Sequence, residues 1–290
     1  MKQPIFTGHA SALITPFKNG EIDFEAMERL IAFQLEGGVD AFVVNGTTGE
    51  PATMTGDEWE KTLAFAVRHV HGRVPVIAGT GGNNTRDIIE KAKKAQELGV
   101  DAQLCVTPYY NKTTQQGLIA HYTAIANETE LPIIVYNVPS RTGLNLLPAT
   151  LEKLSHIPQI VGVKEASANL IQIMDMMNLC GDSICFYCGS DELTAPMMAL
   201  GAQGVISVLS NVAPAYMTAV THGDVKTSMA MHLRLLPLVH ALFAETSPAP
   251  VKEAAHMLGL CENEVRLPLV NVTEETKALL KNEMQKLGLV

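Results

Sequence analysis

Lys164 is the strongest candidate for a reactive side chain, because it follows directly after the apolar run Ile160–Val163. An apolar setting disfavours the charged ammonium and lowers the pKa of a lysine, which leaves more free amine to attack a carbonyl. Tyr136 closes a second apolar run, Pro132–Val135, where a phenol could move protons during imine formation. The alternatives are a lysine that pairs with Glu165 or extends into solvent, and a tyrosine that fills the core. Together the two residues predict Schiff-base chemistry on a carbonyl substrate.

Two polar loops could bind carboxylate groups beside such a lysine. The first, Gly46–Glu50, combines two glycines that allow a tight turn with the hydroxyls of Thr47 and Thr48. It lacks the Lys-Ser/Thr ending of a nucleotide P-loop, so a small carboxylate is the expected ligand and an ordinary glycine turn is the alternative. The second loop, Asn137–Gly143, carries Arg141. Its guanidinium can bind a carboxylate through two hydrogen bonds or remain solvated on the surface.

Two more turn-rich segments follow apolar runs and could line the same pocket. Thr107–Asn111 contains two adjacent tyrosines, for which contact with another subunit is as plausible as catalysis. In Cys188–Glu192, the carboxylates of Asp191 and Glu192 are expected to cap the following helix rather than to transfer protons.

The cysteines and histidines do not form a recognisable metal site in the sequence. Cys185 and Cys188 have a C-x-x-C spacing, but no second pair and no following histidine completes a zinc motif. The chain has 5 cysteines, an odd number that fits reduced thiols in a core. The 9 histidines are scattered, and none is assigned to catalysis. We therefore expect no metal.

These segments need a scaffold that brings the ends of several strands together. Short β-branched runs alternate at regular intervals with stretches of helical periodicity, which is the pattern of a βα repeat. A (β/α)8 TIM barrel of the α/β class gathers such strand ends at one face. Closure is favoured over an open doubly wound sheet because there is no dinucleotide fingerprint. The expected strands are Ser11–Thr15, Ala41–Asn45, Val74–Gly79, Gln103–Thr107, Pro132–Asn137, Ile160–Lys164, Ile184–Cys188 and Gly204–Val208.

Several helix boundaries can also be predicted. In Gly37–Val44, Leu98–Val106 and Leu200–Val208, a glycine is expected to end a helix in a left-handed conformation before an apolar run enters the sheet. Thr55–Glu58 has the spacing of a capping box and predicts a helix start.

Beyond the barrel, helices without an intervening strand are expected at Thr227–Glu245, Ala249–Leu260 and Glu274–Leu287. We therefore predict two domains, a catalytic barrel over residues 1–224 and a C-terminal α-helical appendage over residues 225–290.

Composition limits the compartment and the partners. Of the 290 residues, 47% are hydrophobic, which suits a chain that buries a large aliphatic core. The formal net charge of −9 offers no basic stripe for a nucleic-acid backbone, so nucleic acid is not an expected partner. No uncharged apolar stretch approaches the roughly 20 residues that span a bilayer, and residues 1–17 show no targeting pattern. A cytoplasmic protein without membrane contact is expected.

Five motifs, taken together, resemble those of the dihydrodipicolinate synthase family of pyruvate-dependent class I aldolases, and the resemblance covers nearly the whole chain. The first motif and the strand-end lysine are shared by the wider superfamily, so they specify chemistry, whereas the third motif and the double tyrosine discriminate better. The motifs are GTTGE at Gly46–Glu50, VTPYYN at Val106–Asn111, YNVPSRTG at Tyr136–Gly143, GVKEA at Gly162–Ala166 and GVISV at Gly204–Val208.

The resemblance implies a lyase-type aldol condensation of pyruvate with L-aspartate 4-semialdehyde. The product would be 4-hydroxy-tetrahydrodipicolinate, which commits carbon to diaminopimelate and lysine. Lys164 would form the imine with pyruvate without a further cofactor, and Tyr136 would relay protons.

Further roles are implied by the same resemblance. Thr48 would link Tyr136 to Tyr110 of a neighbouring subunit, and Thr47 and Thr48 would bind the pyruvate carboxylate. Arg141 would receive the carboxylate of the aldehyde. Backbone groups of Gly189 and Ile206 would face the pocket, and the family's usual assembly is a homotetramer built as a dimer of tight dimers.

Family members that are inhibited by lysine bind it at the tight-dimer interface, near the segments that read here Pro51–Trp59, Asn83–Asp87 and Tyr109. The candidate effector residues of this chain are therefore Asn83, Asp87, Tyr109 and Trp59. Where the strongly inhibited bacterial type has a serine, two histidines and a glutamate, this chain has Pro51, Gly56, Trp59 and Asp87. These departures argue against lysine feedback, although Trp59 does not exclude it.

Two rival functions remain open. The first is another pyruvate-type aldolase, such as N-acetylneuraminate lyase or a 2-keto-3-deoxy-sugar-acid aldolase. Arg141 argues against it, because a guanidinium suits a short acceptor with a carboxylate better than a polyhydroxylated chain. The second is a non-catalytic barrel that senses a small acid. The joint presence of the lysine, the tyrosine and the threonine argues against that.

Overall fold

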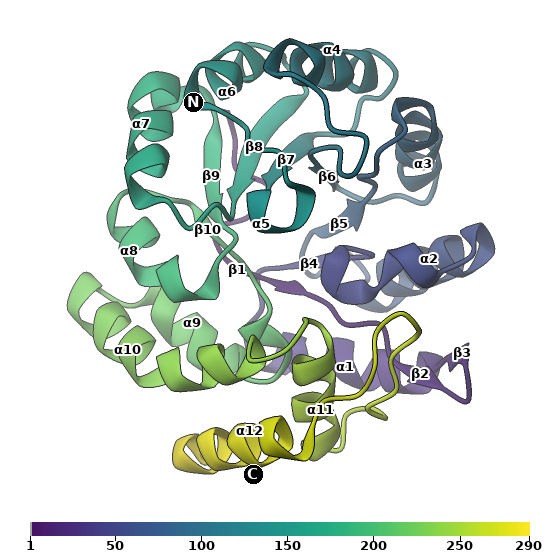
Figure 1. Ribbon diagram of the computed structural model, residues 1–290, viewed down its shortest axis with the longest axis vertical. Helices are drawn as coiled ribbons and strands as arrows, with labels where there is room; N and C mark the ends of the chain where they lie inside the picture. Colours follow the sequence, from purple (N-terminus) through teal and green to yellow (C-terminus); the bar gives the residue numbers. More distant parts are fainter. Residues whose placement is uncertain (1) are drawn as a thin grey trace.

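Eight parallel strands close into a barrel in the computed structural model, which describes residues 2–290 apart from the side chain of Asp182 (Figure 1). The order around the barrel is β1-β10-β9-β8-β7-β6-β5-β4, and every hydrogen-bonded pair is parallel. The predicted (β/α)8 barrel is therefore confirmed. The strands are β1 Gly8–Ala12, β4 Ala41–Val44, β5 Val76–Gly79, β6 Ala102–Val106, β7 Ile133–Asn137, β8 Ile160–Glu165, β9 Cys185–Cys188 and β10 Gly204–Ser207.

Helices surround the barrel and alternate with its strands along the chain (Figure 1). They are α1 Phe24–Glu36, α2 Gly56–Val70, α3 Thr85–Glu97, α4 Gln115–Ala126, α5 Pro139–Thr142, α6 Pro148–Ser155, α7 Leu170–Cys180, α8 Thr194–Ala199 and α9 Pro214–His222. Short 3-10 helices occupy the loops, at η1 Thr47–Gly49, η2 Pro51–Thr53, η3 Gly181–Ser183, η4 Asp191–Leu193 and η5 Leu209–Asn211.

Seven strands lie within one or two residues of their predicted bounds, but the first prediction, Ser11–Thr15, was wrong. β1 begins three residues earlier because its register is set by its neighbours, with Gly8 opposite Gly204 and Ala10 opposite Ala41. The strand sequence GHASA contains no β-branched residue, so the propensity signal came from the segment that follows it. A hairpin of β2 Phe17–Lys18 and β3 Glu21–Ile22, which the sequence did not indicate, comes next.

The predicted helix signals are confirmed. Gly38, Gly99 and Gly201 have φ angles of 82°, 80° and 103°, so a glycine in the left-handed region precedes each of the three strands as expected. The capping box is complete, because Thr55 Oγ1 accepts from Glu58 N at 3.2 Å and Glu58 Oε2 accepts from Thr55 N at 2.8 Å.

Buried side chains form two layers. The inner layer fills the barrel and is built from small and medium residues such as Ala10, Ala41 and Leu104, together with Tyr136 and Tyr187. The outer layer lies between the strands and the helices and contains the larger part of the aliphatic core. This separation is the alternation expected when one face of each strand points into a closed barrel.

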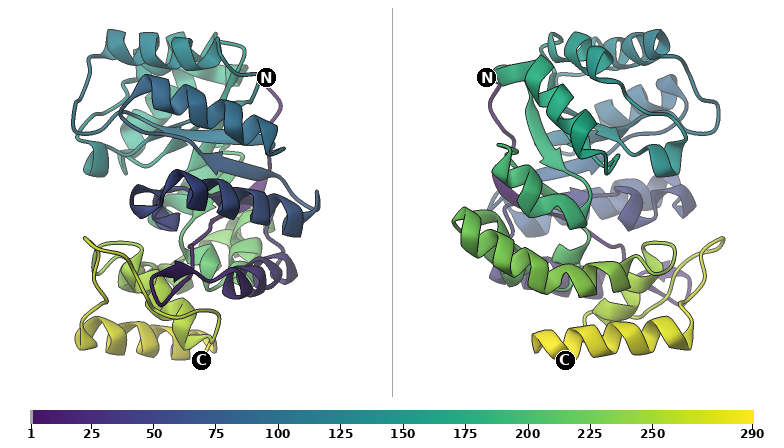
Figure 2. Two further views of the ribbon diagram at one scale, coloured as in Figure 1. Left: turned by 90° about the vertical axis from the view of Figure 1, so that its right-hand side faces the viewer. Right: turned by 60° about the vertical axis from the view of Figure 1, so that its left-hand side comes forward.

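Three helices follow the barrel, α10 Val225–Leu242, α11 Ala249–Met257 and α12 Glu274–Leu287, close to the predicted ranges. α10 packs against α8 and α9 of the barrel and against α12, and α11 packs against α12 (Figure 2). The division into two domains at residue 224 stays a prediction. Within the described part of the chain, no helix is long and apolar enough to cross a membrane.

Candidate active site

A local irregularity in β8 turns Lys164 toward the inside of the barrel. The register with β7 pairs Ile133 with Ile160 but Ile134 with Gly162, so β8 contains one extra residue at this point. In a regular strand, Ile160 and Lys164 would share a face because side chains alternate with a period of two. Ile160 instead belongs to the outer layer, whereas Lys164 faces Tyr136 of the inner layer. The bulge therefore decides that the amine points into the barrel.

Lys164 is only 6% exposed, and this burial lowers its pKa to about 8. Nearby Asp191 and Cys188 oppose the shift, whereas Arg141 adds to it. The Nζ atom lies 4.3 Å from the centroid of the Tyr136 ring, because Tyr136 and Lys164 are register partners on β7 and β8. Close to neutral pH, the side chain thus keeps a usable fraction of free amine.

Glu165 is not the partner of Lys164. Its carboxylate accepts hydrogen bonds from Asn137 Nδ2 at 2.9 Å and from the backbone N of Ser167 at 2.6 Å. The neighbouring position on a strand points to the opposite face, so Glu165 lies on the helix side of β8. The alternative of a structural Lys164–Glu165 ion pair is therefore excluded.

The space beside Lys164 depends on a glycine. A Cβ atom on Gly189 would lie 3.0 Å from Cε and 3.0 Å from Cγ of Lys164, and 2.8 Å from Cβ of Ala166. The backbone N of Gly189 donates to Glu165 O at 2.8 Å, which holds this close approach in place. Ile206, on β10, is buried in the same inner layer as Tyr136.

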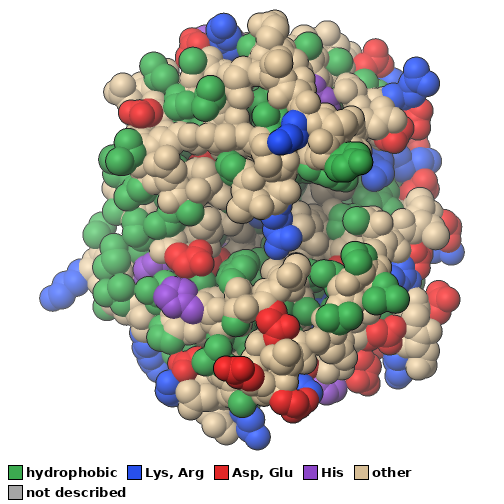
Figure 3. Space-filling model, viewed as in Figure 1, with side chains coloured by type: hydrophobic (Ala, Val, Ile, Leu, Met, Phe, Trp, Pro, Cys, Tyr) green, Lys and Arg blue, Asp and Glu red, His purple; other side chains and the backbone are tan. Residues whose placement is uncertain are grey.

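A cavity of about 370 Å³ opens next to these residues at the ends of β4, β5, β6 and β7. In Figure 3 the centre of the viewed face is hollowed, with basic side chains beside the hollow. Thr47, Tyr109, Tyr136 and Arg141 are among the residues that line the cavity, whereas Lys164, Thr48, Gly189 and Ile206 are not. The amine of Lys164 lies against the ring of Tyr136, and this ring forms part of the cavity wall.

Tyr136 is 7% exposed, and burial raises its pKa to about 12, a shift that the charge of Arg141 partly opposes. Its phenol is therefore protonated at neutral pH and is able to donate a proton. Within the part of the chain that the structure describes, the hydroxyls of Tyr136 and Thr48 form no hydrogen bond with each other, although Thr48 is buried in the Gly46–Glu50 loop.

In the Gly46–Glu50 loop, the residues with left-handed φ angles are not the ones that the sequence indicated. Asn45 and Glu50, and not the two glycines, have left-handed φ angles, of 57° and 56°. Gly49 is needed for space, because a Cβ there would lie 3.2 Å from Leu13 O and 3.2 Å from Thr15 Oγ1. The expectation that the glycines supply the turn was wrong, since side-chain contacts hold the two flanking residues in this conformation instead.

Arg141 lies in α5, at the cavity wall, and its side chain is exposed. Its Nη2 atom is 3.5 Å from the backbone O of Ser247, which is a weak contact. The guanidinium therefore keeps most of its donors free for a ligand in the cavity.

The structure places Tyr110 away from the cavity of its own chain, because its side chain is 91% exposed, with a left-handed φ of 68°. Its contribution to a neighbouring subunit stays a prediction. Asp191 also differs from expectation: its Oδ2 accepts from the backbone N of Val208 at 2.9 Å and of Leu209 at 3.0 Å. It therefore caps η5, after β10, rather than the helix that follows it in sequence.

The candidate effector residues come from two helices and two loops: Trp59 lies in α2 and Asp87 in α3, whereas Asn83 and Tyr109 lie in loops, and Tyr109 lines the cavity. Trp59 is 3% exposed and donates from Nε1 to Gly79 O at 3.2 Å, so its indole fills the core instead of presenting a polar group. Asp87 accepts from Asn84 Nδ2 at 2.8 Å, and the backbone O of Asn83 accepts from Asn111 Nδ2 at 2.9 Å. Whether these residues and Tyr109 bind an effector stays a prediction.

Sequence reasoning missed a wall of the cavity that comes from the C-terminal segments. Thr246, Ser247, Pro248, Pro268 and Leu269 line it, together with Lys91 of α3. The only available signal was the pair of proline-containing runs SPAP and RLPL, and nothing in a single sequence places such loops over the barrel.

All five cysteines are free and buried. Cys185 Sγ contacts Lys2 O at 3.5 Å and Cys188 Sγ contacts Ser190 O at 3.0 Å, so the C-x-x-C pair has backbone partners. Among residues 2–290, no cluster of three or more His, Cys, Asp or Glu side chains is arranged to hold a metal ion.

Comparison with known proteins agrees with this geometry. The model of the dihydrodipicolinate synthetase family matches residues 5–287. The chain is 48% identical over 290 residues to the 4-hydroxy-tetrahydrodipicolinate synthase of Syntrophus aciditrophicus, covering 99% of this chain and 100% of that protein. It superposes on the crystal structure of dihydrodipicolinate synthase from Thermotoga maritima with a TM-score of 0.97 and 44% identity, covering 99% and 100% of the two chains.

A second similar structure is the chloride-inhibited dihydrodipicolinate synthase of Acinetobacter baumannii in complex with pyruvate. Its TM-score is 0.96 and its sequence identity 39%, with 98% of this chain and 99% of that chain covered. The full-length match to the family model, the identities and the superposition all lead to the same assignment. This chain belongs to the dihydrodipicolinate synthetase family.

Proposed function

We propose that this chain condenses pyruvate with L-aspartate 4-semialdehyde to 4-hydroxy-tetrahydrodipicolinate, with loss of one water. The amine of Lys164 attacks the ketone carbon of pyruvate and water leaves, which gives an imine. Loss of a methyl proton converts the imine to an enamine, whose carbon then attacks the aldehyde. The amino group of the adduct finally attacks the imine carbon, which closes the ring and frees Lys164.

One observation carries this proposal: a buried lysine with a pKa of about 8 lies against a protonated tyrosine at the edge of a cavity. An amine with a pKa near the working pH is a good nucleophile toward a carbonyl. A phenol next to it supports each proton transfer of imine formation and of the aldol step. The imine itself is the electron sink, so the reaction as proposed requires no bound cofactor.

Pyruvate and the aldehyde would bind to different walls of the cavity. Thr47 and Thr48 would hold the pyruvate carboxylate by hydroxyl and backbone donors, and Gly189 and Ile206 would border the imine. Arg141, whose donors are largely free, would bind the carboxylate of the semialdehyde. A small acceptor fits a cavity of about 370 Å³ that has a single guanidinium in its wall.

The assembly that we propose is a homotetramer of tight dimers. The exposed side chain of Tyr110 supports a dimer at least, because an exposed aromatic next to the half-exposed Tyr109 is a typical interface anchor. In the dimer, Tyr110 would reach the Thr48–Tyr136 pair of the partner. A cytoplasmic location agrees with a biosynthetic role for small soluble substrates.

The direct test is reduction with borohydride in the presence of pyruvate. We expect one reduced pyruvate per chain, and peptide mapping should place it on Lys164. Without an adduct on the wild-type chain, the proposed imine chemistry fails. A coupled assay that compares the semialdehyde with N-acetylmannosamine and sugar-derived aldehydes then tests the acceptor, and preference for a sugar aldehyde would contradict the role of Arg141.

A further inference from the structure

A buried ion pair joins the Gly46–Glu50 loop to the C-terminal helices. Lys252 Nζ, on α11, lies 2.5 Å from Glu50 Oε1, with the two side chains 0% and 1% exposed. The same Nζ donates to Glu264 O at 2.8 Å and lies 4.0 Å from the centre of the Phe17 ring. Such a pair adds little to net stability because both charges must be desolvated. Stabilisation of the fold therefore does not explain by itself why the pair is present.

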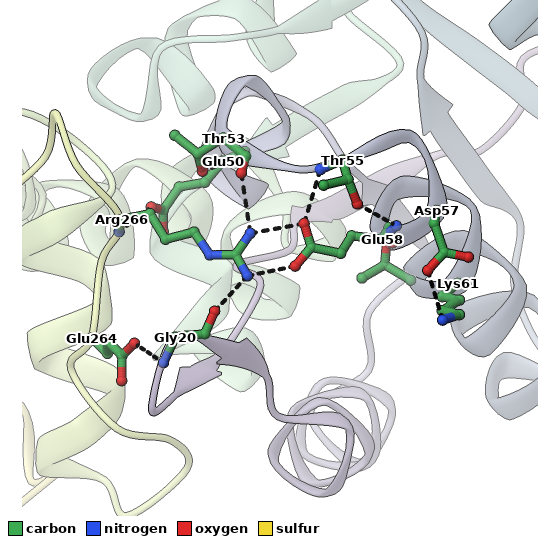
Figure 4. Close-up of polar contacts among 10 residues, drawn as sticks. Gly20, Glu50, Thr53, Thr55, Asp57, Glu58, Lys61, Glu264 and Arg266 are labelled. Atoms are coloured by element: carbon green, nitrogen blue, oxygen red, sulfur yellow. Dashed lines mark hydrogen bonds and ion pairs between the residues drawn. The ribbon is translucent and has the colours of Figure 1, made fainter.

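Arg266 makes a second connection to the same stretch of chain. Its backbone N donates to Glu50 Oε2 at 3.1 Å, and its guanidinium donates to Thr53 O at 3.1 Å and to Gly20 O at 2.6 Å (Figure 4). The guanidinium also forms two hydrogen bonds to the carboxylate of Glu58, at 3.0 and 2.5 Å. Residues 50–58 are thus attached to the C-terminal segment at three positions.

Glu50 occupies a special place in this arrangement. It ends η1 and precedes η2 with a φ of 56°, a conformation that a residue other than glycine adopts only when its surroundings enforce it. It also lies in the wall of the cavity, in the same short loop as Thr47 and Thr48. Moving the Glu50 carboxylate would therefore move the loop that carries these two threonines.

We propose that Glu50 is a positioning residue, and that its ion pair with Lys252 lets the C-terminal helices hold Thr47 and Thr48 at the cavity wall. This inference rests on the proposed function, because it takes the loop as the binding site for the pyruvate carboxylate. Both carboxylate oxygens of Glu50 already have partners, Oε1 in Lys252 Nζ and Oε2 in the backbone N of Arg266, so Glu50 acts through the loop. The C-terminal helices thereby become part of the substrate-binding apparatus.

The test separates positioning from folding by steady-state kinetics of Glu50→Gln and Lys252→Met. A displaced loop raises the KM for pyruvate, by about tenfold or more, because misplacement of binding groups by about 1 Å has effects of this size or larger. The KM for the aldehyde changes less than about twofold, since Arg141 lies in a separate loop. A merely structural role lowers the folded fraction and thus the apparent kcat, and leaves both KM values unchanged.

Glu253→Gln is the matched control. Glu253 is the neighbour of Lys252, is 3% exposed, and accepts a hydrogen bond from Asn263 Nδ2 at 2.7 Å, entirely within the C-terminal segment. The substitution removes one negative charge, as Glu50→Gln does, but from α11, the helix that carries Lys252, and without a contact to the loop. We expect both KM values to stay within about twofold of wild type, whatever happens to the melting temperature. A comparable rise in the KM for pyruvate here would overturn the assignment to Glu50.

Each single variant leaves one buried charge without its partner, so a loss of folding is a foreseeable result. The double variant Glu50→Gln/Lys252→Met removes both charges and keeps an acceptor for Arg266 N. We expect it to fold and still to show a raised KM for pyruvate. A wild-type KM in the double variant would overturn the proposal.

A measurement without substrate separates this inference from the proposed function. Hydrogen exchange of the peptide that covers residues 46–53 should be faster in Glu50→Gln and in the double variant than in wild type and in Glu253→Gln. Unchanged exchange refutes the positioning role even if the enzyme uses pyruvate. Faster exchange in the variants, together with a wild-type chain that forms no adduct with pyruvate, would show that Glu50 holds the loop. It would also refute the role of this loop in binding pyruvate.

Discussion

The amine of Lys164 lies 4.3 Å from the centre of the Tyr136 ring, and the two residues are register partners on β8 and β7. Backbone hydrogen bonding between the strands therefore fixes their distance, and no flexible loop is involved. A rigid strand pair is a suitable support for a nucleophile and its proton donor, because misplacement by about 1 Å can cost about 10²-fold in rate.

The first prediction concerns pH. Burial lowers the pKa of Lys164 to about 8, so the neutral amine is the minor form below this pH and the major form above it. The second-order rate of imine formation with pyruvate should rise about tenfold per pH unit below about 8 and level off above it. Rapid borohydride trapping across the pH range measures this. A profile that keeps rising to the ordinary lysine value of 10.5 would contradict the effect of burial.

The second prediction concerns the space beside the amine. Gly189→Ala introduces a Cβ 3.0 Å from two carbons of Lys164, so the lysine must move. Imine formation should slow by about tenfold or more, with the barrel still folded, as checked by trapping rates and by circular dichroism. Gly56→Ala is the control, because a Cβ there meets nothing within 4 Å and the residue starts α2. It should leave trapping unchanged, with stability equal to or up to about 1 kcal/mol above wild type.

The third prediction concerns the phenol. Tyr136→Phe keeps the ring against Lys164 and removes the hydroxyl, so kcat should fall by about 10²–10⁴-fold, which is the usual size of general acid–base effects. Tyr122→Phe is the control, since its buried hydroxyl donates to Cys105 O at 3.0 Å in the outer layer, away from the cavity. That variant should lose about 1 kcal/mol of stability and no activity per folded chain. Equal losses of kcat in the two variants would show that Tyr136 does not take part in proton transfer.

The periodicity of the chain predicted the barrel because a βα repeat is a local pattern, and every strand except the first could be located within it to one or two residues. It could not predict which way Lys164 points. Counted from Ile160 with ideal alternation, the lysine would face the helices, and only the extra residue in β8 turns it inward. A bulge is set by the partner strand, and a single sequence contains no record of that pairing.

Contacts over long sequence distances were also out of reach. Trp59 was grouped with candidate effector residues, yet its indole is buried against Gly79, because helix packing decides which face of α2 is covered. In the same way, the GTTGE motif indicated the turn and its threonines, whereas the partner that holds Glu50 lies about 200 residues away, at Lys252. Motifs in a sequence thus indicate which chemistry is possible, whereas tertiary contacts determine where the side chains that carry it out lie.

The fourth prediction concerns the acceptor. Arg141→Lys keeps the positive charge but loses the planar pair of donors, so the KM for the semialdehyde should rise by about tenfold or more. Trapping of pyruvate on Lys164 should change little, because the carboxylate of pyruvate would bind to the other wall of the cavity. Loss of pyruvate trapping in this variant, with no change in the KM for the aldehyde, would show that Arg141 binds pyruvate and not the semialdehyde.

The fifth prediction concerns the contribution of Tyr110 to the neighbouring subunit. Tyr110→Phe and Lys164→Ala chains should each be nearly inactive alone, whereas co-expression should restore activity. Random pairing makes half of the dimers mixed, and each mixed dimer contains one complete site, so about a quarter of the wild-type activity is expected. Tyr136→Phe with Lys164→Ala is the control: the two residues are register partners within one barrel, and no mixed dimer can contain a complete site. No recovery in the first mixture would mean that Tyr110, exposed in its own chain, does not serve the partner's site.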